Sequence, residues 1–329
     1  MPTPKNPKPA VKSELSLRLA ASLEQAVGAD WRQRRYGIAV SGGPDSMALV
    51  WLMAQLLPDQ VSAATVDHGL RTNSADEAAM VAAYCAQLGL PHHILCPAQP
   101  IAGSLQASAR AERYRLLEKW RSDTEVDDIV TAHHADDQLE TLLMRLNRSS
   151  GISGLSGIRR RNGHILRPLL DWRRSELLQI ALDANISFVE DPSNQDHRFD
   201  RARLRTALKG QQIIDPLSAA KSASWLAEAD EALDWAVDTA IAAWPDPTNR
   251  DLLYDCAYPA EIFRRILTRR LRLHDPDLTI RGSAMLSIIT AMQSRQRAMV
   301  GSLIIDPIPN QAHSWRISAA PCRKSAKTR

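Results

Sequence analysis

A polar hexapeptide, Ser41-Gly42-Gly43-Pro44-Asp45-Ser46, most constrains what this chain can fold into. It follows the apolar run 36–40 and precedes the apolar stretch 47–53, so the sequence predicts a strand, a tight turn and a helix. Two glycines let the backbone approach a ligand closely, and the free N–H groups at the start of a helix favour an anion. A carboxylate beside phosphates suits a site where Mg²⁺ lies between them. We therefore expect a phosphate-binding loop, with Asp45 as the Mg²⁺ ligand.

Strand and helix patterns alternate up to about residue 170. Strands are expected at 61–66, 92–96 and 128–132, and helices at 74–88, 104–120 and 136–147. This alternation predicts an α/β fold with a parallel, doubly wound sheet. Ligands of such sheets bind beyond the carboxyl ends of the strands. The hexapeptide, His68 and the stretch 133–137 all fall at such ends.

The pattern changes after residue 210. The chain divides into an N-terminal tail and helix (1–30), a catalytic domain (31–210) and a third part (211–329). The third part is expected to be a smaller helical domain that ends in a short β hairpin, with strands at 299–305 and 314–318, and a basic tail. The fold class is thus a parallel α/β domain followed by a helical domain and a hairpin.

Charge and cysteine usage limit the classes of protein. The net charge of +4 and pI of about 9.0 fit contact with nucleic acid. The four cysteines show no C-x-x-C or Cys/His spacing, so neither a disulfide framework nor a zinc site is predicted. Residues 1–12 lack the apolar core of a signal peptide, and no run of roughly 18 apolar residues could span a membrane. We expect a cytoplasmic protein; whether it forms a homodimer stays open.

The hexapeptide differs from two common nucleotide-binding loops. It lacks the Gly-Lys-[Ser/Thr] end of a Walker A motif, and the dinucleotide fingerprint G-x-G-x-x-G is absent. The pattern Ser-Gly-Gly-x-Asp-Ser after a strand resembles the pyrophosphate (PP) loop of the N-type ATP pyrophosphatases. That superfamily cleaves ATP between the α- and β-phosphates and adenylates an oxygen of the substrate. The alternative interpretation is an ordinary Gly-Asp turn between a strand and a helix, without a ligand-binding role.

Further motifs narrow the resemblance within this superfamily. In chain order they are Val66-Asp67-His68-Gly69-Leu70-Arg71, Ala109–Tyr114, Thr131–Thr141, Gly151–Gly157, Arg167-Pro168-Leu169-Leu170 and Glu190–Asn194. Each motif alone is moderately specific, but their order resembles the tRNA(Ile)-lysidine synthetase family over residues 36–206. The resemblance implies ATP-dependent ligation of L-lysine to C2 of the cytidine at the first anticodon position of an isoleucine tRNA with a CAU anticodon. An adenylated tRNA is the intermediate, and the products are lysidine, AMP and pyrophosphate.

The chemistry that the resemblance implies can be assigned to residues. ATP is expected to bind to Ser41, Gly42, Gly43, Pro44, Asp45, Ser46, His68 and Arg110. Catalytic roles are expected for Asp45, Arg113, His133, Asp137 and Glu140. Arg110 and Arg113 lie three residues apart on one helix face, and arginine suits forked contacts to phosphate. Of His133 and His134, one is expected to contact phosphate or move a proton, and the other to cap or pack.

The acidic helix start has two interpretations. Carboxylates at a helix N-terminus are favoured by the helix dipole, by about 0.3–1 kcal/mol each. Asp137 and Glu140, at i and i+3, can instead orient the lysine ammonium. Similarly, arginine clusters can be solvated surface or can contact tRNA phosphates. The tRNA-binding candidates are Arg198, Arg203, Arg205, Arg265 and Arg269, the last two on a predicted helical stripe with Arg272.

Alternative functions remain open at this point. A tRNA cytidine thiolase would use paired cysteines, which the sequence lacks. NAD synthetase or a glutamine-dependent amidotransferase is another candidate; the latter would need a glutaminase part, for which the chain is not expected to have room. A non-catalytic tRNA-binding module would explain a degenerate loop, but all six loop positions are intact.

Overall fold

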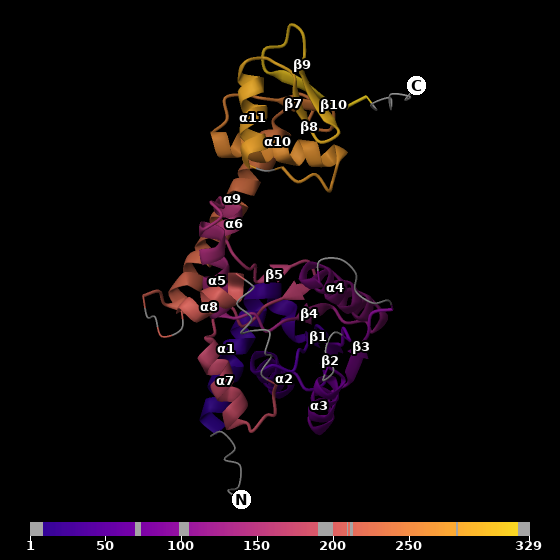
Figure 1. Ribbon diagram of the computed structural model, residues 1–329, viewed down its shortest axis with the longest axis vertical. Helices are drawn as coiled ribbons and strands as arrows, with labels where there is room; N and C mark the ends of the chain where they lie inside the picture. The colour runs from indigo at the N-terminus through magenta and orange to yellow at the C-terminus, as the bar shows by residue number, and fades with distance from the viewer. Residues whose placement is uncertain are drawn as a thin grey trace, which may run out of the picture. The chain divides into compact units, whose positions relative to one another are not determined.

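The computed structural model describes residues 9–69, 74–98, 105–189, 200–208, 210, 213–280 and 282–321. The chain divides into two compact units, Met1–Ala227 and Glu228–Arg329 (Figure 1). This division falls later in the chain than the boundary expected at 210, because the long helix α9 (Pro216–Ala242) begins in the first unit and ends in the second. Each unit has its own hydrophobic core.

The first unit is built on a six-stranded sheet with the order β3-β2-β1-β4-β6-β5. Its strands are β1 (Tyr36–Ala39), β2 (Val61–Val66), β3 (His92–Leu95), β4 (Asp128–Val130), β5 (Arg161–Asn162) and β6 (Ile165–Leu166). All neighbours pair in parallel except β5, which forms an antiparallel hairpin with β6. The predicted parallel α/β fold is confirmed, with an antiparallel edge strand that was not predicted. Asn162-Gly163 was the available signal, since Asn-Gly favours hairpin turns.

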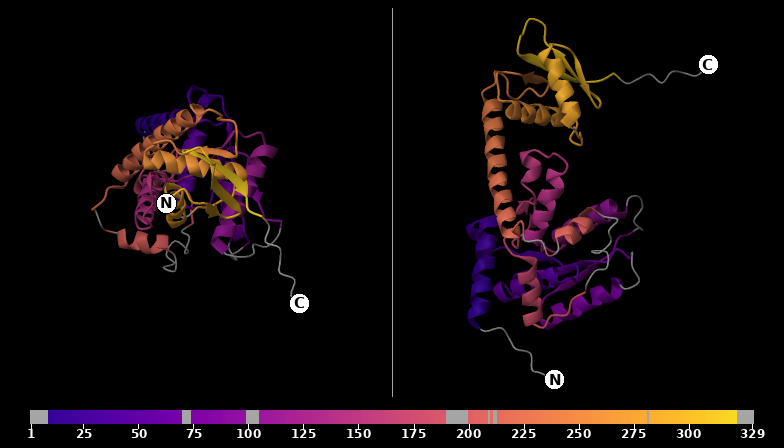
Figure 2. Two further views of the ribbon diagram at one scale, coloured as in Figure 1. Left: turned by 90° about the horizontal axis from the view of Figure 1, so that it is seen from above. Right: turned by 60° about the vertical axis from the view of Figure 1, so that its left-hand side comes forward.

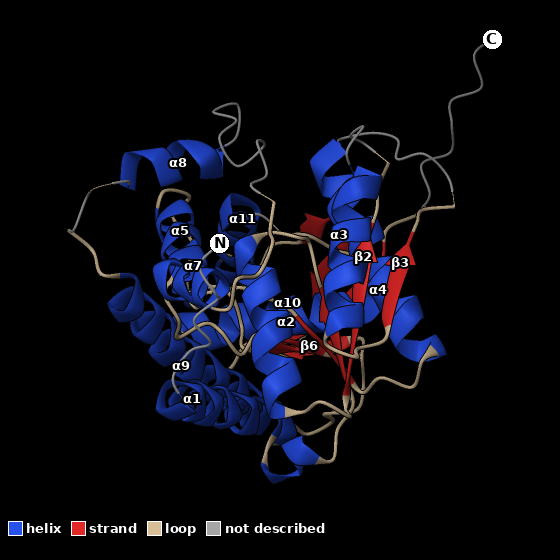
Figure 3. Cartoon of the chain, turned by 90° about the horizontal axis from the view of Figure 1, so that it is seen from below, coloured by secondary structure: helices blue, strands red, loops and turns tan. Residues whose placement is uncertain are grey.

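Helices lie on both sides of this sheet (Figure 3). They are α1 (Pro9–Val27), η1 (Ala29–Arg32), α2 (Pro44–Leu56), α3 (Ser74–Gln87), α4 (Leu105–Asp123), α5 (Ala135–Leu146), α6 (Ile152–Leu155), α7 (Arg174–Asp183) and α8 (Asp200–Leu208). Side chains of β1 and of the residue after it alternate between two cores: Ile38 and Val40 pack with α1, α2, α3 and α7, whereas Ala39 packs with the α4 residues Leu117 and Trp120. The two-sided burial explains why these strands are nearly continuous apolar runs.

Gly37 on β1 marks where α4 comes closest to the sheet. A Cβ atom at this position would lie 2.5 Å and 2.6 Å from two ring atoms of Trp120, and 3.0 Å from Cγ1 of Val126. Trp120 is buried, so its ring has little room to move. Only glycine therefore fits at this position of the strand.

Replacement of Gly37 by alanine is expected to destabilise the protein by about 1–3 kcal/mol, because the added methyl group overpacks the interface between β1 and Trp120. Urea unfolding monitored by tryptophan fluorescence measures the change. Gly151→Ala is the matched control, since residue 151 has φ −74° and nothing within 4 Å of the added Cβ. Equal urea midpoints for Gly37→Ala and Gly151→Ala would show that Trp120 and α4 can move away from β1 at little cost.

The second unit combines helices with an antiparallel sheet. Besides the end of α9 it contains α10 (Ala260–His274), α11 (Gly282–Gln293), β7 (Leu252–Tyr254), β8 (Ala298–Val300), β9 (Leu303–Pro307) and β10 (Ser314–Ala319). The strand order is β7-β10-β9-β8, and residues of α9, α10, α11 and all four strands share one core (Figure 2).

The predicted C-terminal hairpin is only part of this sheet. The stretch expected as one strand, 299–305, is two strands, β8 and β9, because the chain turns at Gly301, whose φ of +56° favours glycine. Strand β7, which pairs with β10, was not predicted, since its three residues give too short a pattern. None of the described helices is long and apolar enough to cross a membrane.

Candidate active site

The loop between β1 and α2 adopts a defined conformation. Gly42 has φ +80°, a value that glycine adopts without strain. Ser46 Oγ donates a hydrogen bond to the Gly43 carbonyl (3.0 Å) and accepts one from the Ser41 amide (3.2 Å). Gly43, the N-cap of α2, contributes no side-chain cap, and Pro44 opens the helix. The helix start is therefore free to bind an anion, as the hexapeptide predicts.

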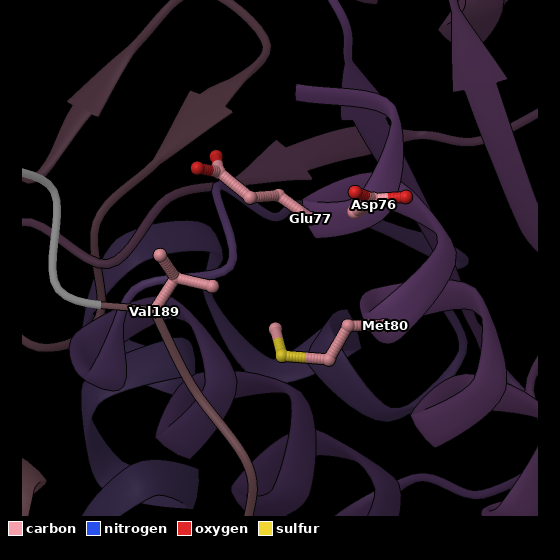
Figure 4. A pocket seen from close by; sticks show the side chains of 4 residues that line it. All are labelled: Asp76, Glu77, Met80 and Val189. Carbon is pink, nitrogen blue, oxygen red and sulfur yellow. The ribbon is translucent and has the colours of Figure 1, made fainter. Parts of the chain in front are cut away.

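Beside this loop lies a hollow of about 290 Å³ lined by Asp76, Glu77, Met80 and Val189 (Figure 4). It adjoins the loop because the Val189 amide donates to the Gly42 carbonyl (2.9 Å). Its two carboxylates have the wrong charge for a direct phosphate contact. The hollow therefore does not suit a phosphate group, and phosphate binding by the loop amides stays a prediction.

The end of β4 brings a second charged group to the loop. His134, which is 2% exposed, is the N-cap of α5 and forms a capping box with Asp137. Its Nε2 atom lies 3.5 Å from Asp45 Oδ2 and 3.5 Å from Asp137 Oδ2. Burial alone would lower the pKa of His134, but the carboxylates of Asp137 and Asp45 raise it above its usual value. His134 is thus the capping histidine and links the loop to α5.

His133 has a different environment. Its Nδ1 atom lies 2.9 Å from the Thr131 hydroxyl. Burial lowers the pKa of His133 to about 3; Asp137 opposes this change, whereas Arg167 and Arg113 reinforce it. A neutral His133 therefore faces arginine side chains, in agreement with the expectation that only one of the two histidines caps the helix. Its contact with phosphate stays a prediction.

Arg110, Arg113 and His68 meet at the same edge of the sheet. Both guanidinium groups lie over the Tyr114 ring, with Cζ atoms 5.1 Å and 5.2 Å from its centre. Burial and the charge of Arg113 lower the pKa of His68. Tyr114 and Arg167, which lie near these arginines, belong to motifs named above, but no role was predicted for them. The position of Arg167 was the available signal, because it directly follows a strand and so lies at the carboxyl end of that strand.

Glu140 is held by two arginines of α8. It is 4% exposed, and its carboxylate accepts hydrogen bonds from Arg201 Nε (2.7 Å) and Arg205 Nε (2.7 Å). Two guanidinium groups leave this carboxylate little capacity to bind a lysine ammonium directly. The geometry gives Glu140 a positioning role between α5 and α8, which differs from its predicted catalytic role.

Asp137 retains a place beside the loop. Its Oδ2 atom accepts a hydrogen bond from the His134 amide (3.1 Å), and Oδ1 lies 3.2 Å from Arg201. Burial raises the pKa of Asp137, but His134 and Arg201 outweigh burial and the net shift is downward. Asp137 is therefore an ionised carboxylate close to Asp45 and His134.

The predicted tRNA-binding arginines differ in their surroundings. Arg203 is exposed on α8, Arg205 is held by Glu140, and Arg198 lies outside the described residues. In the second unit Arg265 contacts Asp230 (2.5 Å), Asp234 and Glu261, and Arg269 contacts Asp234 and Asp238. Two arginines of the stripe on α10 thus pair with acids on α9, and these pairs compete with phosphate contacts. The helical spacing alone could not reveal these partners.

Replacement of Arg265 by glutamate is expected to destabilise the second unit by about 3 kcal/mol, because it removes the guanidinium that pairs with the buried Asp230 carboxylate and places another carboxylate beside it. Urea unfolding measures this loss. Arg264→Glu is the matched control: residue 264 is the neighbouring arginine, 46% exposed, and its single ion pair with Glu261 contributes little. Equal stability of the two variants would mean that the Arg265 pairs do not support the unit.

The side chains around Asp45 decide whether Mg²⁺ fits beside the loop. Among the described residues, no three His, Cys, Asp or Glu side chains are arranged to hold a metal ion. However, Asp45 Oδ1 is buried without a hydrogen-bond partner, and a carboxylate oxygen is the kind of ligand that Mg²⁺ prefers. A site of one carboxylate completed by nucleotide phosphates fits these residues.

Comparison with known proteins agrees with this geometry. Residues 15–212 match the family model of the PP-loop domain. A protein described as tRNA(Ile)-lysidine synthase from Novosphingobium aromaticivorans is 39% identical over 317 residues, which cover 90% of this chain and 94% of the relative. The chain belongs to the tRNA(Ile)-lysidine synthase family. A second relative with this description, from Zymomonas mobilis, is 38% identical over 302 residues, or 89% of this chain and 90% of the relative.

A solved structure supports the fold alone. A U34-tRNA thiolase from Methanococcus maripaludis has a TM-score of 0.54 and 15% sequence identity, and the likeness covers 66% of this chain and 80% of the thiolase. The family assignment and the fold therefore rest on separate observations. The match to the PP-loop domain also supports the use of ATP by this chain.

Proposed function

We propose that this chain ligates L-lysine to C2 of the cytidine at the first anticodon position of an isoleucine tRNA with a CAU anticodon. As a member of the tRNA(Ile)-lysidine synthase family it is an enzyme of the ligase class. The observation that carries the mechanism is the contact between the PP loop and the end of β4, where His134 joins Asp45 to Asp137. This contact brings together the residues for both steps of the reaction.

In the first step, the cytidine O2 attacks the α-phosphorus of ATP and pyrophosphate leaves. In this proposal the loop amides and the hydroxyls of Ser41 and Ser46 bind the β- and γ-phosphates, which the uncapped start of α2 supports. Asp45 would hold Mg²⁺, which when bound neutralises charge on the departing pyrophosphate. Arg110 and Arg113 would contact the phosphate that is transferred, since guanidinium groups bind phosphate oxygens in pairs.

In the second step, an amine of lysine attacks C2, and AMP leaves with the oxygen that it activated. The amine must first lose a proton, because the free ammonium has a pKa of about 10.4. We assign orientation of the ammonium to Asp137, whose carboxylate is ionised beside the loop. Glu140 supports this position indirectly by holding α8 against α5.

The substrate RNA requires contacts outside the loop. We propose that Arg203, exposed on α8, contributes to tRNA binding. Phosphate contacts make affinity depend on salt, so this role has a measurable signature. We also place the enzyme in the cytoplasm, because its RNA substrate is found there. The described cysteines are unpaired and Cys85 is buried, which favours this function over a thiolase with paired cysteines.

The nucleotide products test the proposal. In a reaction with ATP, lysine and the CAU tRNA, we expect AMP and pyrophosphate in equal amounts. The matched control is the same tRNA with uridine at the first anticodon position, which should leave ATP intact. Formation of ADP and phosphate, or equal AMP formation with the control tRNA, would contradict the proposal.

A further inference from the structure

Arg167 is a buried cation without a carboxylate partner among the described residues. It directly follows β6 and is 6% exposed. Its Nη1 atom donates to the Arg159 carbonyl (2.7 Å), whereas its Nε atom is buried with no hydrogen-bond partner. A buried charge is costly unless it is paired. The position of Arg167 therefore calls for an anion that the polypeptide itself does not supply there.

The neighbours of Arg167 are cationic or neutral. The Tyr114 hydroxyl accepts a hydrogen bond from Arg110 Nη2 (3.4 Å), and the Arg113 guanidinium lies over the Tyr114 ring, with its Cζ atom 5.2 Å from the ring centre. Burial raises the pKa of Tyr114, but the three arginines outweigh burial and lower it. Three guanidinium groups thus lie near Tyr114, and their like charges repel one another.

Other polar atoms of this group are also unpaired. Arg113 Nε and His68 Nδ1 are buried without hydrogen-bond partners. Neutral His133 faces the same arginines and is adjacent in sequence to His134, which contacts Asp45. Three buried nitrogen atoms, on Arg167, Arg113 and His68, thus lack hydrogen-bond partners. Together they point to a ligand with several acceptor oxygens.

We propose that Arg167 is the third arginine of a pocket that binds the α-phosphate of ATP, together with Arg110 and Arg113, and that Tyr114 is the positioning residue that holds the three guanidinium groups. The inference rests on the proposed function, which supplies the nucleotide. A backbone phosphate of the RNA has the same chemistry. The nucleotide is favoured because His133, near the arginines, is followed by His134, which contacts Asp45 of the loop.

Calorimetric titration with ATP and with pyrophosphate, both with Mg²⁺, separates this pocket from the loop. Only ATP carries an α-phosphate, whereas both ligands occupy the loop. For Arg167→Lys and for Tyr114→Phe we expect ATP to bind at least about tenfold more weakly and pyrophosphate to bind as in the wild type. Lysine cannot reproduce the forked contact, and phenylalanine lacks the hydroxyl that accepts from Arg110. Unfolding midpoints verify that both variants are folded.

Arg115→Gln is the matched control, since residue 115 lies on the same helix but pairs with Glu112 at the surface. Unchanged ATP affinity in both test variants would overturn the inference. Unchanged ATP affinity with weaker tRNA binding and a smaller salt dependence would assign the pocket to an RNA phosphate and would also overturn it. These titrations do not depend on lysine transfer. If the wild-type enzyme forms no lysidine, the proposed function is contradicted, but the titrations still test the inference about the phosphate site.

Discussion

Replacement of Asp45 by alanine is expected to lower the rate of tRNA-dependent ATP–pyrophosphate exchange by at least ~10²-fold, the loss typical when one electrostatic group is removed from a reacting oxygen. Asp45 Oδ1 is buried beside the PP loop without a hydrogen-bond partner, so it is available as the proposed Mg²⁺ ligand, which alanine removes. Binding of tRNA should change little, because the RNA contacts are proposed at arginines outside the loop. Exchange is measured by incorporation of labelled pyrophosphate into ATP.

Asp59→Ala is the control for this variant. Residue 59 is an exposed acid in the turn that follows α2, so its loss changes the net charge equally without touching the loop. Wild-type exchange in a folded Asp45→Ala protein would remove the basis for the PP-loop mechanism. A loss of folding is not expected, since the hydrogen bonds that shape the loop come from Ser41, Gly43 and Ser46.

Replacement of Asp137 by asparagine is expected to slow lysine transfer by ~10²-fold or more, with a smaller effect on adenylation. Lysine is the only cationic substrate, and the ionised Asp137 carboxylate is the group assigned to its ammonium. Asparagine keeps the oxygen that accepts the His134 amide, so the cap of α5 persists. Single-turnover experiments starting from the adenylated tRNA measure transfer separately from adenylation.

Glu140→Gln provides the comparison for Asp137→Asn. It weakens the contacts to Arg201 and Arg205, and we expect a lower unfolding midpoint, because those contacts are buried and charge-assisted. Asp137→Asn also loses an ion pair with Arg201, so the rates are compared at a temperature at which the unfolding midpoints show both variants to be folded. If Asp137→Asn slows both half-reactions equally, Asp137 serves the fold or the metal and does not orient lysine.

The first unit was predictable because its signals are local. The hexapeptide, the strand at 61–66 and the apolar runs around them each depend on neighbouring residues, and the structure confirms these elements. The carboxyl-end rule also brought the loop and the stretch 133–137 together correctly. By contrast, the short strands β5 and β7 depend on pairing partners distant in sequence.

The functions of single charged residues were harder to predict. The spacing of Arg265 and Arg269 indicates one face of a helix, but not that α9 presents acids to that face. From the sequence, Glu140 suits a lysine-binding site. In the structure its carboxylate is bound by Arg201 and Arg205, which follow it by 61 and 65 residues. Arg167 shows the reverse, since only the three-dimensional structure reveals that it lacks a carboxylate partner among the described residues.

Transfer of label from lysine to the tRNA tests the central claim most directly. The protein is incubated with ATP, labelled lysine and the CAU isoleucine tRNA, and the tRNA is digested to nucleosides. The account predicts that label appears in one nucleoside, from the first anticodon position, and only when ATP is present. Absence of label from that nucleoside in an enzyme that binds ATP and this tRNA, or label at another position, would contradict the account.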